Sequence, residues 1–272
     1  MRITTRNARF QQWAALLTNR TKRQRSGEFL VQGVRPITLA VEHGWPIRAL
    51  LYAQGRRLSS WAERTLDETS AERVEMAPAL LDELAGKEDA ELVAVAALPP
   101  DDLERITPEG PVLVFDRAAE PGNIGTVVRS ADAFGAAGVI VTGHAADPYD
   151  PKSVRASTGS LFALPVVRVP APRPVIEWAR ESGLRVVGTD ETGTVDVGDH
   201  DLRGPVLLVI GNETRGMSGT WAAACDDVVR IPIVGAASSL NAASAATVFL
   251  YEAARQRGVA AGTAPEKIRS RR

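Results

Sequence analysis

The sequence has few of the residues that build metal clusters, disulfides or cysteine-based sites. Its 272 residues include one cysteine, Cys225, and three scattered histidines, no two of which have metal-ligand spacing. A lone cysteine excludes an internal disulfide, and cysteine-based or histidine-based metal sites need several ligands. We therefore expect a protein that binds no metal.

Long apolar runs are also missing. No stretch of about 18 apolar residues occurs, so the sequence predicts no transmembrane helix. Residues 1–13 are basic, but no apolar core follows them, unlike in a secretory signal. We expect a cytoplasmic protein that does not bind a membrane.

Three common active-site motifs are absent as well. The chain has no G-x-x-x-x-G-K-[ST] phosphate loop, no G-x-G-x-x-G opening a helix and no G-x-S-x-G turn. ATPases, dinucleotide-dependent oxidoreductases and α/β-hydrolases therefore lack their usual sequence support.

The charge that is present lies unevenly along the chain. Residues 1–35 carry a balance of +7 and residues 251–272 one of +4, whereas the rest carries −12. Basic ends on an acidic body indicate contact with a polyanion, most simply a nucleic acid. The alternative is a solvated arm and tail, although Phe10, Trp13, Leu16 and Leu17 recur at helical spacing within the basic arm.

Short apolar segments alternate with helical patterns along the whole chain. In the first hundred residues we expect strands at 29–32, 47–52, 73–76 and 91–97, and helices at 34–43, 59–67 and 78–85. A segment rich in proline and acids at 99–110 predicts a linker between two domains, 1–98 and 111–258, with a basic tail at 259–272.

The alternation resumes after the linker. We expect strands at 111–116, 138–143, 164–169, 184–190, 205–211 and 227–233, and helices from 123, at 151–158, at 173–182 and at 239–257. Val-, Ile- and Leu-rich strands without polar alternation are typical of sheets covered on both faces. The sequence predicts an α/β fold with a mainly parallel sheet in the second domain.

Polar turns follow two of these strands. The segment IGNETRGMS (210–218) places an amide and a carboxylate beside glycines, and SSLN (238–241) opens the last helix. A third polar turn, VGTDETG (187–193), follows another strand. Because ligands bind at the carboxyl ends of parallel strands, these turns predict a binding site.

Two further segments have two interpretations each. On the helix from 123, Asn123 fits a cap, and Arg129 faces away from the apolar stripe, toward solvent, a ligand or a partner subunit. The segment 151–162 suits phosphate contacts through Lys152, Arg155 and its hydroxyls, or is simply a capped surface helix.

Taken together, these turns resemble the three signature motifs of the SpoU (TrmH) branch of the SPOUT RNA methyltransferases. Asn123 and Arg129 match the first motif, 211–216 the second and 231–241 the third. The resemblance covers 111 to about 257, and 27–53 is similar to the L30-like substrate-binding domain of the same family.

The resemblance implies a knotted (trefoil) SPOUT domain, S-adenosylmethionine as cofactor, and a homodimer that methylates a ribose 2′-hydroxyl of RNA. The implied catalytic residues are Arg129, Asn123, Glu213 and Asn241. The implied cofactor-binding residues are Gly188, Thr189, Ile210, Gly211, Asn212, Gly216, Ile231, Ile233, Ser239 and Leu240.

The last expectation concerns which RNA the protein methylates and which residues bind it. The resemblance implies a uridine of 23S rRNA and, as one role, resistance to a ribosome-targeting antibiotic; tRNA methylation and a non-catalytic rRNA-binding module are the alternatives. The basic residues expected to bind RNA are Arg6, Arg9, Arg20, Lys22, Arg23, Arg25, Arg35, Lys152 and Arg155. Because RNA recognition usually targets unpaired bases, Trp13, Trp45 and Tyr52 are candidates for stacking, with core packing as the alternative.

Overall fold

The structure is a computed structural model that describes residues 1–258. Contacts divide the chain into two compact units. The first holds Met1–Asp101, Glu120–Arg129 and Ala146–Ala163, and the second holds Asp102–Ala119, Ser130–Ala145 and the described residues from 164 onward. The predicted tail at 259–272 lies outside the described residues.

The first unit contains a five-stranded mixed sheet. Its order is β1 (Arg2–Ile3), β4 (Glu72–Met76), β3 (Ile47–Ala53), β5 (Leu92–Ala97) and β2 (Glu28–Gln32). Strands β1, β4 and β3 are parallel to one another, whereas β5 runs antiparallel to both β3 and β2.

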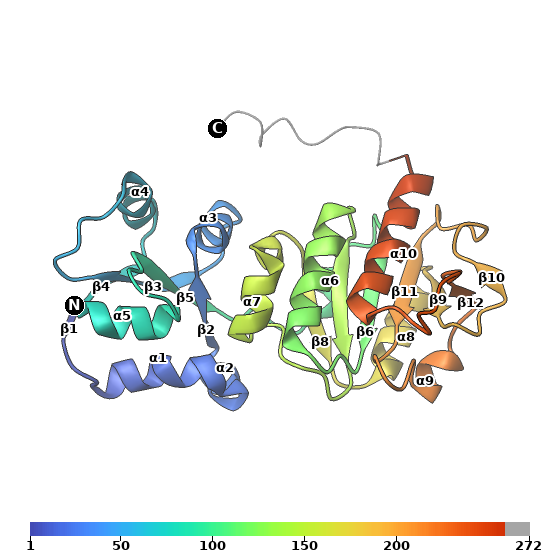
Figure 1. Ribbon diagram of the computed structural model, residues 1–272, viewed down its shortest axis with the longest axis horizontal. Helices are drawn as coiled ribbons and strands as arrows, with labels where there is room; N and C mark the ends of the chain where they lie inside the picture. The colour runs from blue at the N-terminus through green and yellow to red at the C-terminus, as the bar shows by residue number, and fades with distance from the viewer. Residues whose placement is uncertain (259–272) are drawn as a thin grey trace. The chain divides into compact units, whose positions relative to one another are not determined.

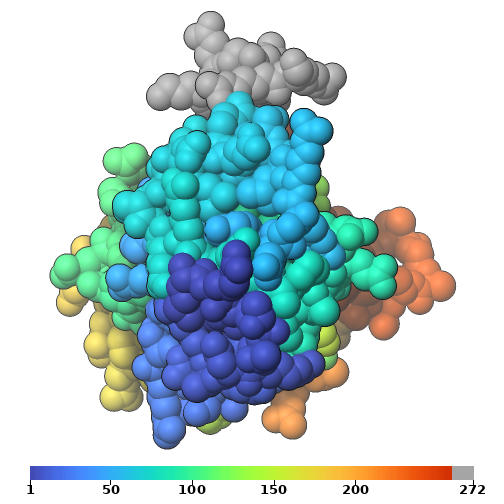
Figure 2. Space-filling view, turned by 90° about the vertical axis from the view of Figure 1, so that its left-hand side faces the viewer, coloured from blue at the N-terminus to red at the C-terminus, as the bar shows by residue number. Residues whose placement is uncertain are grey.

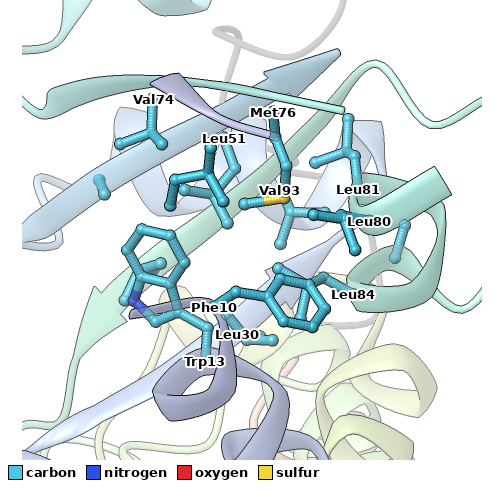
Figure 3. Close-up of a cluster of buried hydrophobic side chains, with 14 of the residues drawn as sticks. Phe10, Trp13, Leu30, Leu51, Val74, Met76, Leu80, Leu81, Leu84 and Val93 are labelled. Atoms are coloured by element: carbon cyan, nitrogen blue, oxygen red, sulfur yellow. The ribbon is translucent and has the colours of Figure 1, made fainter. Parts of the chain in front are cut away.

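Helices cover both faces of this sheet (Figure 1). Helices α1 (Ala8–Thr18) and α5 (Pro78–Ala85) lie on one face, and α3 (Val34–Glu42) and α4 (Ser60–Glu68) lie on the other. Phe10 and Trp13 of α1 point into a core shared with Leu81 and Leu84 of α5 (Figure 3). Trp13 is therefore a core residue, as the packing alternative predicted.

The predicted basic arm is a folded part of this unit. Strand β1 pairs with β4, and α1 begins at a cap in which Asn7 accepts from the backbone N–H of Phe10. Arg6 donates two hydrogen bonds to Glu83, and Arg9 pairs with Glu72. Figure 2 shows these N-terminal residues, in dark blue, on the surface of the unit. With Arg2 paired to Glu75 and Arg23 to Asp147, four of the eight basic side chains of the arm are matched by carboxylates.

Short helices complete the first unit. They are α2 (Arg20–Ser26), α7 (Pro151–Ser157) and the 3₁₀ turn η2 (Ser160–Phe162). Asn19 caps α2 and Asp150 caps α7, each accepting a backbone N–H two or three residues on. Trp45 donates to the carbonyl of Phe162 at 3.1 Å and packs edge-on against its ring.

The second unit contains a seven-stranded sheet. Its order is β10 (Val195–Asp196), β12 (Asp227–Arg230), β9 (Arg185–Thr189), β11 (Val206–Ile210), β6 (Val112–Asp116), β7 (Gly138–Thr142) and β8 (Val166–Val169). Every pairing is parallel, and Ile210 lies between Thr189 and Phe115 in the register. The ends of β9, β11 and β6 therefore lie side by side.

Helices also cover this sheet on both faces. Helices α8 (Pro172–Glu181) and α9 (Gly219–Ala222) pack on one face through a core that includes Leu207, Val209 and Trp221. Because side chains alternate along a strand, Ile210 points to the other face, where α10 (Ala242–Gln256) contacts β11. Helix α6 (Pro121–Ala133) is divided between the units, its residues up to Arg129 clustering with the first.

The predicted strands and helices form close to their expected bounds. The short β1, α2, β10 and α9 were not predicted, and α1 was indicated only by the helical spacing of apolar residues in the arm. The last helix begins at Ala242 rather than 239 because Asn241 caps it, accepting from the N–H groups of Ala243 and Ser244. In the predicted linker, η1 (Leu103–Arg105) leads to Ile106, which is buried in the core of the second unit.

Two negative findings concern the described residues. None of the helices within 1–258 has the length and hydropathy required to span a bilayer. Over the same residues, no group of three or more His, Cys, Asp or Glu side chains is arranged to hold a metal ion.

Candidate active site

A pocket of about 530 Å³ lies in the second unit, where the loops after β9, β11 and β12 meet the start of α10. The residues that line it are Thr189, Asp190, Glu191, Ile210, Gly211, Asn212, Glu213, Thr214, Arg215, Gly216, Arg230, Ile231, Ile233, Ser238, Ser239, Leu240, Ala242, Ala245 and Phe249. Nine of the ten predicted cofactor residues are among them, together with the predicted catalytic residue Glu213. Turns about 20 residues apart in sequence thus form one pocket because their strands are parallel.

The loop after β11 is tightly shaped by its own backbone. Asn212 and Gly216 exchange two backbone hydrogen bonds, of 2.9 and 3.0 Å. The Asn212 side chain accepts from the N–H groups of Thr214 and Arg215. A Cβ on Gly211 would lie 2.3 Å from the carbonyl carbon of Gly216, so only glycine fits at position 211. In this structure Asn212 shapes the loop as well as lining the pocket.

The third motif forms the opposite wall of the pocket. Asn241 caps α10, and the next turns of that helix present Ala242, Ala245 and Phe249 to the pocket. Asn241 itself does not line the pocket, so its observed contacts are those of a helix cap. The two small alanines leave room between α10 and the loops, and Phe249 adds an aromatic ring to the lining.

Gly188 is the one predicted cofactor residue that does not line the pocket. A Cβ there would lie 2.6 Å from the Sγ of Cys225 and 2.7 Å from Met217, because these side chains pack directly on strand β9. Burial, with the nearby charge of Asp226, raises the pKa of Cys225 to about 11. A raised pKa keeps the thiol mainly protonated at neutral pH, which disfavours a nucleophilic role for Cys225.

The remaining predicted catalytic residues lie on α6. Asn123 is half-buried in its first turn, and Arg129 is exposed one and a half turns later. Both lie on the part of α6 that clusters with the first unit. Their place in the reaction stays a prediction.

The predicted RNA-binding residues separate into two groups. In the first group the side chains are held by hydrogen bonds or ion pairs to other residues of the protein: Arg6, Arg9, Arg23 and Arg155. Arg23 is only 2% exposed and donates to Asp147 at 2.8 Å and to the carbonyl of Leu16 at 2.6 Å. A side chain held in this way cannot reach a phosphate, so we remove Arg23 from the RNA-binding set. Arg155 is exposed but donates to Gln32 at 2.6 Å.

The second group is open to solvent. Lys22 and Arg25 on α2, Arg35 on α3 and Lys152 on α7 are exposed, as is Arg20. Arg23 also lies 3.4 Å from Asp150, the cap of α7, so α2 and the first turn of α7 are neighbours. Lys152 therefore lies near the basic helix α2. In the same segment, Ser157 and Ser160 are buried and offer nothing to a phosphate.

Several residues of the pocket had no sequence-based prediction of their own. They include Asp190, Glu191, Arg215, Arg230 and Phe249. Asp190, Glu191 and Arg215 lie inside the predicted turns 187–193 and 210–218, and Arg230 directly precedes the third motif at 231–241, so considering every residue of each turn would have found three of these four. Phe249 follows Ala242 and Ala245 at helical spacing, which is a usable signal once the helix start is known.

A parallel sheet with a pocket at the carboxyl ends of its strands is the architecture of an α/β enzyme that binds a nucleotide-like ligand. Residues 110–251 match the SpoU rRNA methylase family and residues 7–94 match the SpoU L30e-like domain. The chain belongs to the SpoU rRNA methylase family.

Individual relatives are similar over nearly the whole chain. The 23S rRNA (uridine(2479)-2′-O)-methyltransferase of Streptomyces viridochromogenes is 60% identical over 265 residues, covering 94% of this chain and 92% of that protein. The crystal structure of the SpoU methyltransferase AviRb from the same organism, in complex with AdoMet, matches with a TM-score of 0.88 and 58% identity over 95% of this chain and all of that one. An AdoMet-bound rRNA methyltransferase from Sinorhizobium meliloti matches with a TM-score of 0.85 and 31% identity, over 94% and 97% of the two chains.

Proposed function

We propose that this protein transfers a methyl group from S-adenosylmethionine to a ribose 2′-hydroxyl of RNA, with a uridine of 23S rRNA as the substrate. The observation that carries the proposal is the pocket, in which Glu213 and nine expected cofactor residues meet. The uridine and the 23S rRNA are taken from the Streptomyces relative, which is 60% identical.

The pocket suits S-adenosylmethionine in size and chemistry. Its volume of about 530 Å³ lies within the range of roughly 300–1,000 Å³ typical of small-molecule sites. Ile210, Ile231 and Leu240 offer an apolar wall for an adenine ring, and Ser239 offers a hydroxyl; the Thr189 hydroxyl donates to the carbonyl of Val209 and can only accept from a ligand. The cofactor, when bound, supplies a methyl group that is already activated by its positive sulfur.

The protein's task is then to align the ribose and to help one proton leave the 2′-hydroxyl. An arginine guanidinium stays protonated in proteins, so Arg129 is a poor base. We assign Arg129 to the neighbouring phosphate, where its charge favours the alkoxide form of the hydroxyl. Asn123 orients Arg129 or the ribose, and Glu213 holds that arrangement. Arg129 acts from the same chain or from the second copy of a homodimer.

The RNA surface is assigned to α2 and the start of α7. Lys22 and Arg25 are exposed there, with Lys152 nearby, whereas Arg6 and Arg9 are engaged by carboxylates. Phosphate contacts by exposed cations supply most of the affinity of such surfaces. The base of the nucleotide whose ribose is methylated is read by the rest of the first unit.

The homodimer, the cytoplasm and antibiotic resistance belong to the same proposal. Tyr251 of α10 is 48% exposed and packs edge-on against Phe134, the residue that follows α6, an apolar face suited to a second copy. The cytoplasm follows from the ribosomal substrate. Resistance follows if methylation blocks a drug site on the ribosome.

A methylation assay tests the proposal. Purified protein is incubated with tritiated S-adenosylmethionine and either 23S rRNA or total tRNA from a strain lacking the gene, and 2′-O-methyl sites are then mapped. We expect label in 23S rRNA at one uridine. Label in tRNA alone contradicts the rRNA assignment, and calorimetry without cofactor binding contradicts the enzyme itself in favour of a non-catalytic rRNA-binding module.

A further inference from the structure

The end of strand β6 carries a buried carboxylate that joins three neighbouring segments. Asp116 is 1% exposed and accepts hydrogen bonds from the hydroxyl of Thr142 at 3.1 Å and the backbone N–H of Ser218 at 2.8 Å. Its third donor is the Nε of Arg117, at 3.0 Å. Asp116 thus ties β6 to the end of β7 and to the chain that follows the pocket loop.

Arg117 extends this connection to the pocket loop itself. Its Nη2 donates to the carbonyl of Gly216 at 2.8 Å, and its own carbonyl accepts from the Nδ2 of Asn212 at 2.8 Å. Asn212 and Gly216 are the two ends of the turn that lines the pocket. Arg117 therefore contacts both ends of the turn without lining the pocket.

The backbone of Arg117 is unusual as well. Its φ of +52° lies in the left-handed region, where only two other non-glycine residues of the described chain lie. Such a conformation persists where surrounding contacts determine it, and functional sites are common places for it. Here the backbone N–H of Arg117 donates to the carbonyl of Thr142 at 2.9 Å and its carbonyl accepts from Asn212, while its side chain binds Asp116 and Gly216. The side chain also lies over Gly143, where a Cβ would come within 2.5 Å of its Cγ.

An ion pair between the sequence neighbours Asp116 and Arg117 does not by itself require the hydrogen bond from Arg117 to Gly216. A guanidinium can donate from Nε to one acceptor and from Nη2 to another in a fixed geometry, whereas a lysine has one nitrogen on a flexible stem. Arg117 uses both nitrogens, one toward Asp116 and one toward Gly216. The arrangement therefore calls for arginine and not merely for positive charge.

We infer that Arg117 is a positioning residue of the reaction: it holds the turn from Asn212 to Gly216 in the shape that binds the cofactor. This inference rests on the proposed function for the identity of the ligand. The shape of the turn is independent of that proposal. The side chain acts through the turn and does not touch the cofactor.

Calorimetry with three variants tests the inference. Loss of one charge-assisted hydrogen bond to the turn predicts that Arg117→Ala weakens binding of S-adenosylmethionine about 10- to 100-fold. The turnover at saturating cofactor changes much less, so KM for the cofactor rises while kcat stays within about threefold. Arg117→Lys recovers only part of the affinity. Wild-type affinity in Arg117→Ala overturns the inference.

A glycine variant separates the side chain from the backbone. Arg117→Gly adopts the left-handed backbone freely and removes the side chain. We expect it to bind the cofactor as weakly as Arg117→Ala. If Arg117→Gly binds as tightly as the wild type, the backbone and not the guanidinium shapes the turn, and the inference is overturned. The matched control is Arg185→Ala. It removes the arginine at the start of β9, which pairs with Asp227 of β12, and we expect it to keep full affinity for the cofactor.

Hydrogen exchange supplies a measurement that needs no cofactor. In the free protein, the amide of Gly216 is bonded to the carbonyl of Asn212, and exchange in the peptide 211–218 reports on this turn. We expect at least tenfold faster exchange there in Arg117→Ala, with unchanged exchange in β6 and β11. Unchanged exchange in 211–218 overturns the inference, even if the wild type binds no S-adenosylmethionine, a result that would contradict the proposed function alone.

Discussion

The two sheets of this molecule differ in strand direction, and the difference accounts for where the candidate chemistry lies. In the first unit β5 runs against both β2 and β3, so the carboxyl ends of the strands are divided between two edges. In the second unit all pairings are parallel, so the turns after β9, β11 and β12 share one edge. Only the second arrangement brings several polar turns together.

Arginines bind carboxylates in both units, as Arg23 does with Asp147 in the first and Arg185 with Asp227 in the second. In the second unit Arg117 also binds a turn of the pocket. The comparison predicts that variants at the pocket of the second unit alter cofactor binding, whereas variants of the first unit alter stability and RNA affinity. Helix α6, shared by both, carries the residue with the largest expected effect.

Arg129→Ala tests the shared helix. We expect kcat to fall about 10²- to 10³-fold, the effect of removing a charge that stabilises a developing oxyanion, while cofactor affinity is unchanged. Transfer of tritiated methyl groups measures kcat, and calorimetry measures the cofactor affinity. Arg173→Ala, which removes an exposed arginine of α8, is the control. Near-wild-type turnover in Arg129→Ala would show that this residue has no catalytic role.

Arg23→Ala tests the buried pair of the first unit. Removing Arg23 takes the cation away from the buried carboxylate of Asp147, which costs about 3–5 kcal/mol of unfolding free energy. Arg6→Ala, from a surface pair whose arginine is 58% exposed, costs only about 0–1 kcal/mol. Urea unfolding monitored by circular dichroism compares the two. Equal losses of unfolding free energy in the two variants would mean that burial does not make the Arg23–Asp147 pair more important for stability than the Arg6–Glu83 pair.

Gly211→Val tests the packing of the pocket loop. The new side chain meets backbone atoms 2.3 and 2.4 Å away, which cannot yield without moving the turn. We expect about 100-fold weaker cofactor binding, since displacements near 1 Å have effects of this size. Gly219→Ala is the matched control, because a Cβ there meets nothing within 4 Å. The prediction fails if Gly211→Val binds the cofactor normally by calorimetry.

The smallest expected effect concerns the RNA surface. Lys22→Ala combined with Arg25→Ala weakens RNA binding about five- to tenfold and lowers the salt slope of log K by about two. Arg6→Ala with Arg9→Ala removes the same charge from side chains already paired, so its effect is smaller. Filter binding at several salt concentrations measures both. If the second pair has the larger effect, α2 is not the main phosphate contact.

Most elements were predictable because apolar periodicity is a local property of the sequence. The predicted strand at 205–211 is β11, and the predicted helix at 173–182 is α8, each within a residue or two. The pocket was predictable for a related reason: polar turns after Val- and Ile-rich strands predict a parallel sheet with a shared edge. Resemblance to a known family supplied the cofactor, which no pattern alone indicates.

Contacts between distant residues were not predictable. Arg23 lies in the basic run KRQR, and nothing local indicates that it is buried against Asp147, more than a hundred residues away. The pairing of Arg9 with Glu72 is equally invisible in sequence. The contacts of Arg117 could not be predicted because this residue matches no motif. They depend on the fold of a turn about 100 residues later in the sequence. Charge counts locate cations along a chain and not on a surface.

The state of Cys225 has a practical consequence for spectroscopy. It is the sole cysteine of the chain, and its thiol stays protonated well above neutral pH. A maleimide dye at pH 7 therefore reacts first with a second cysteine placed at an exposed position, such as Lys152→Cys. We therefore expect selective fluorescent labelling at such a position with the native thiol still in place.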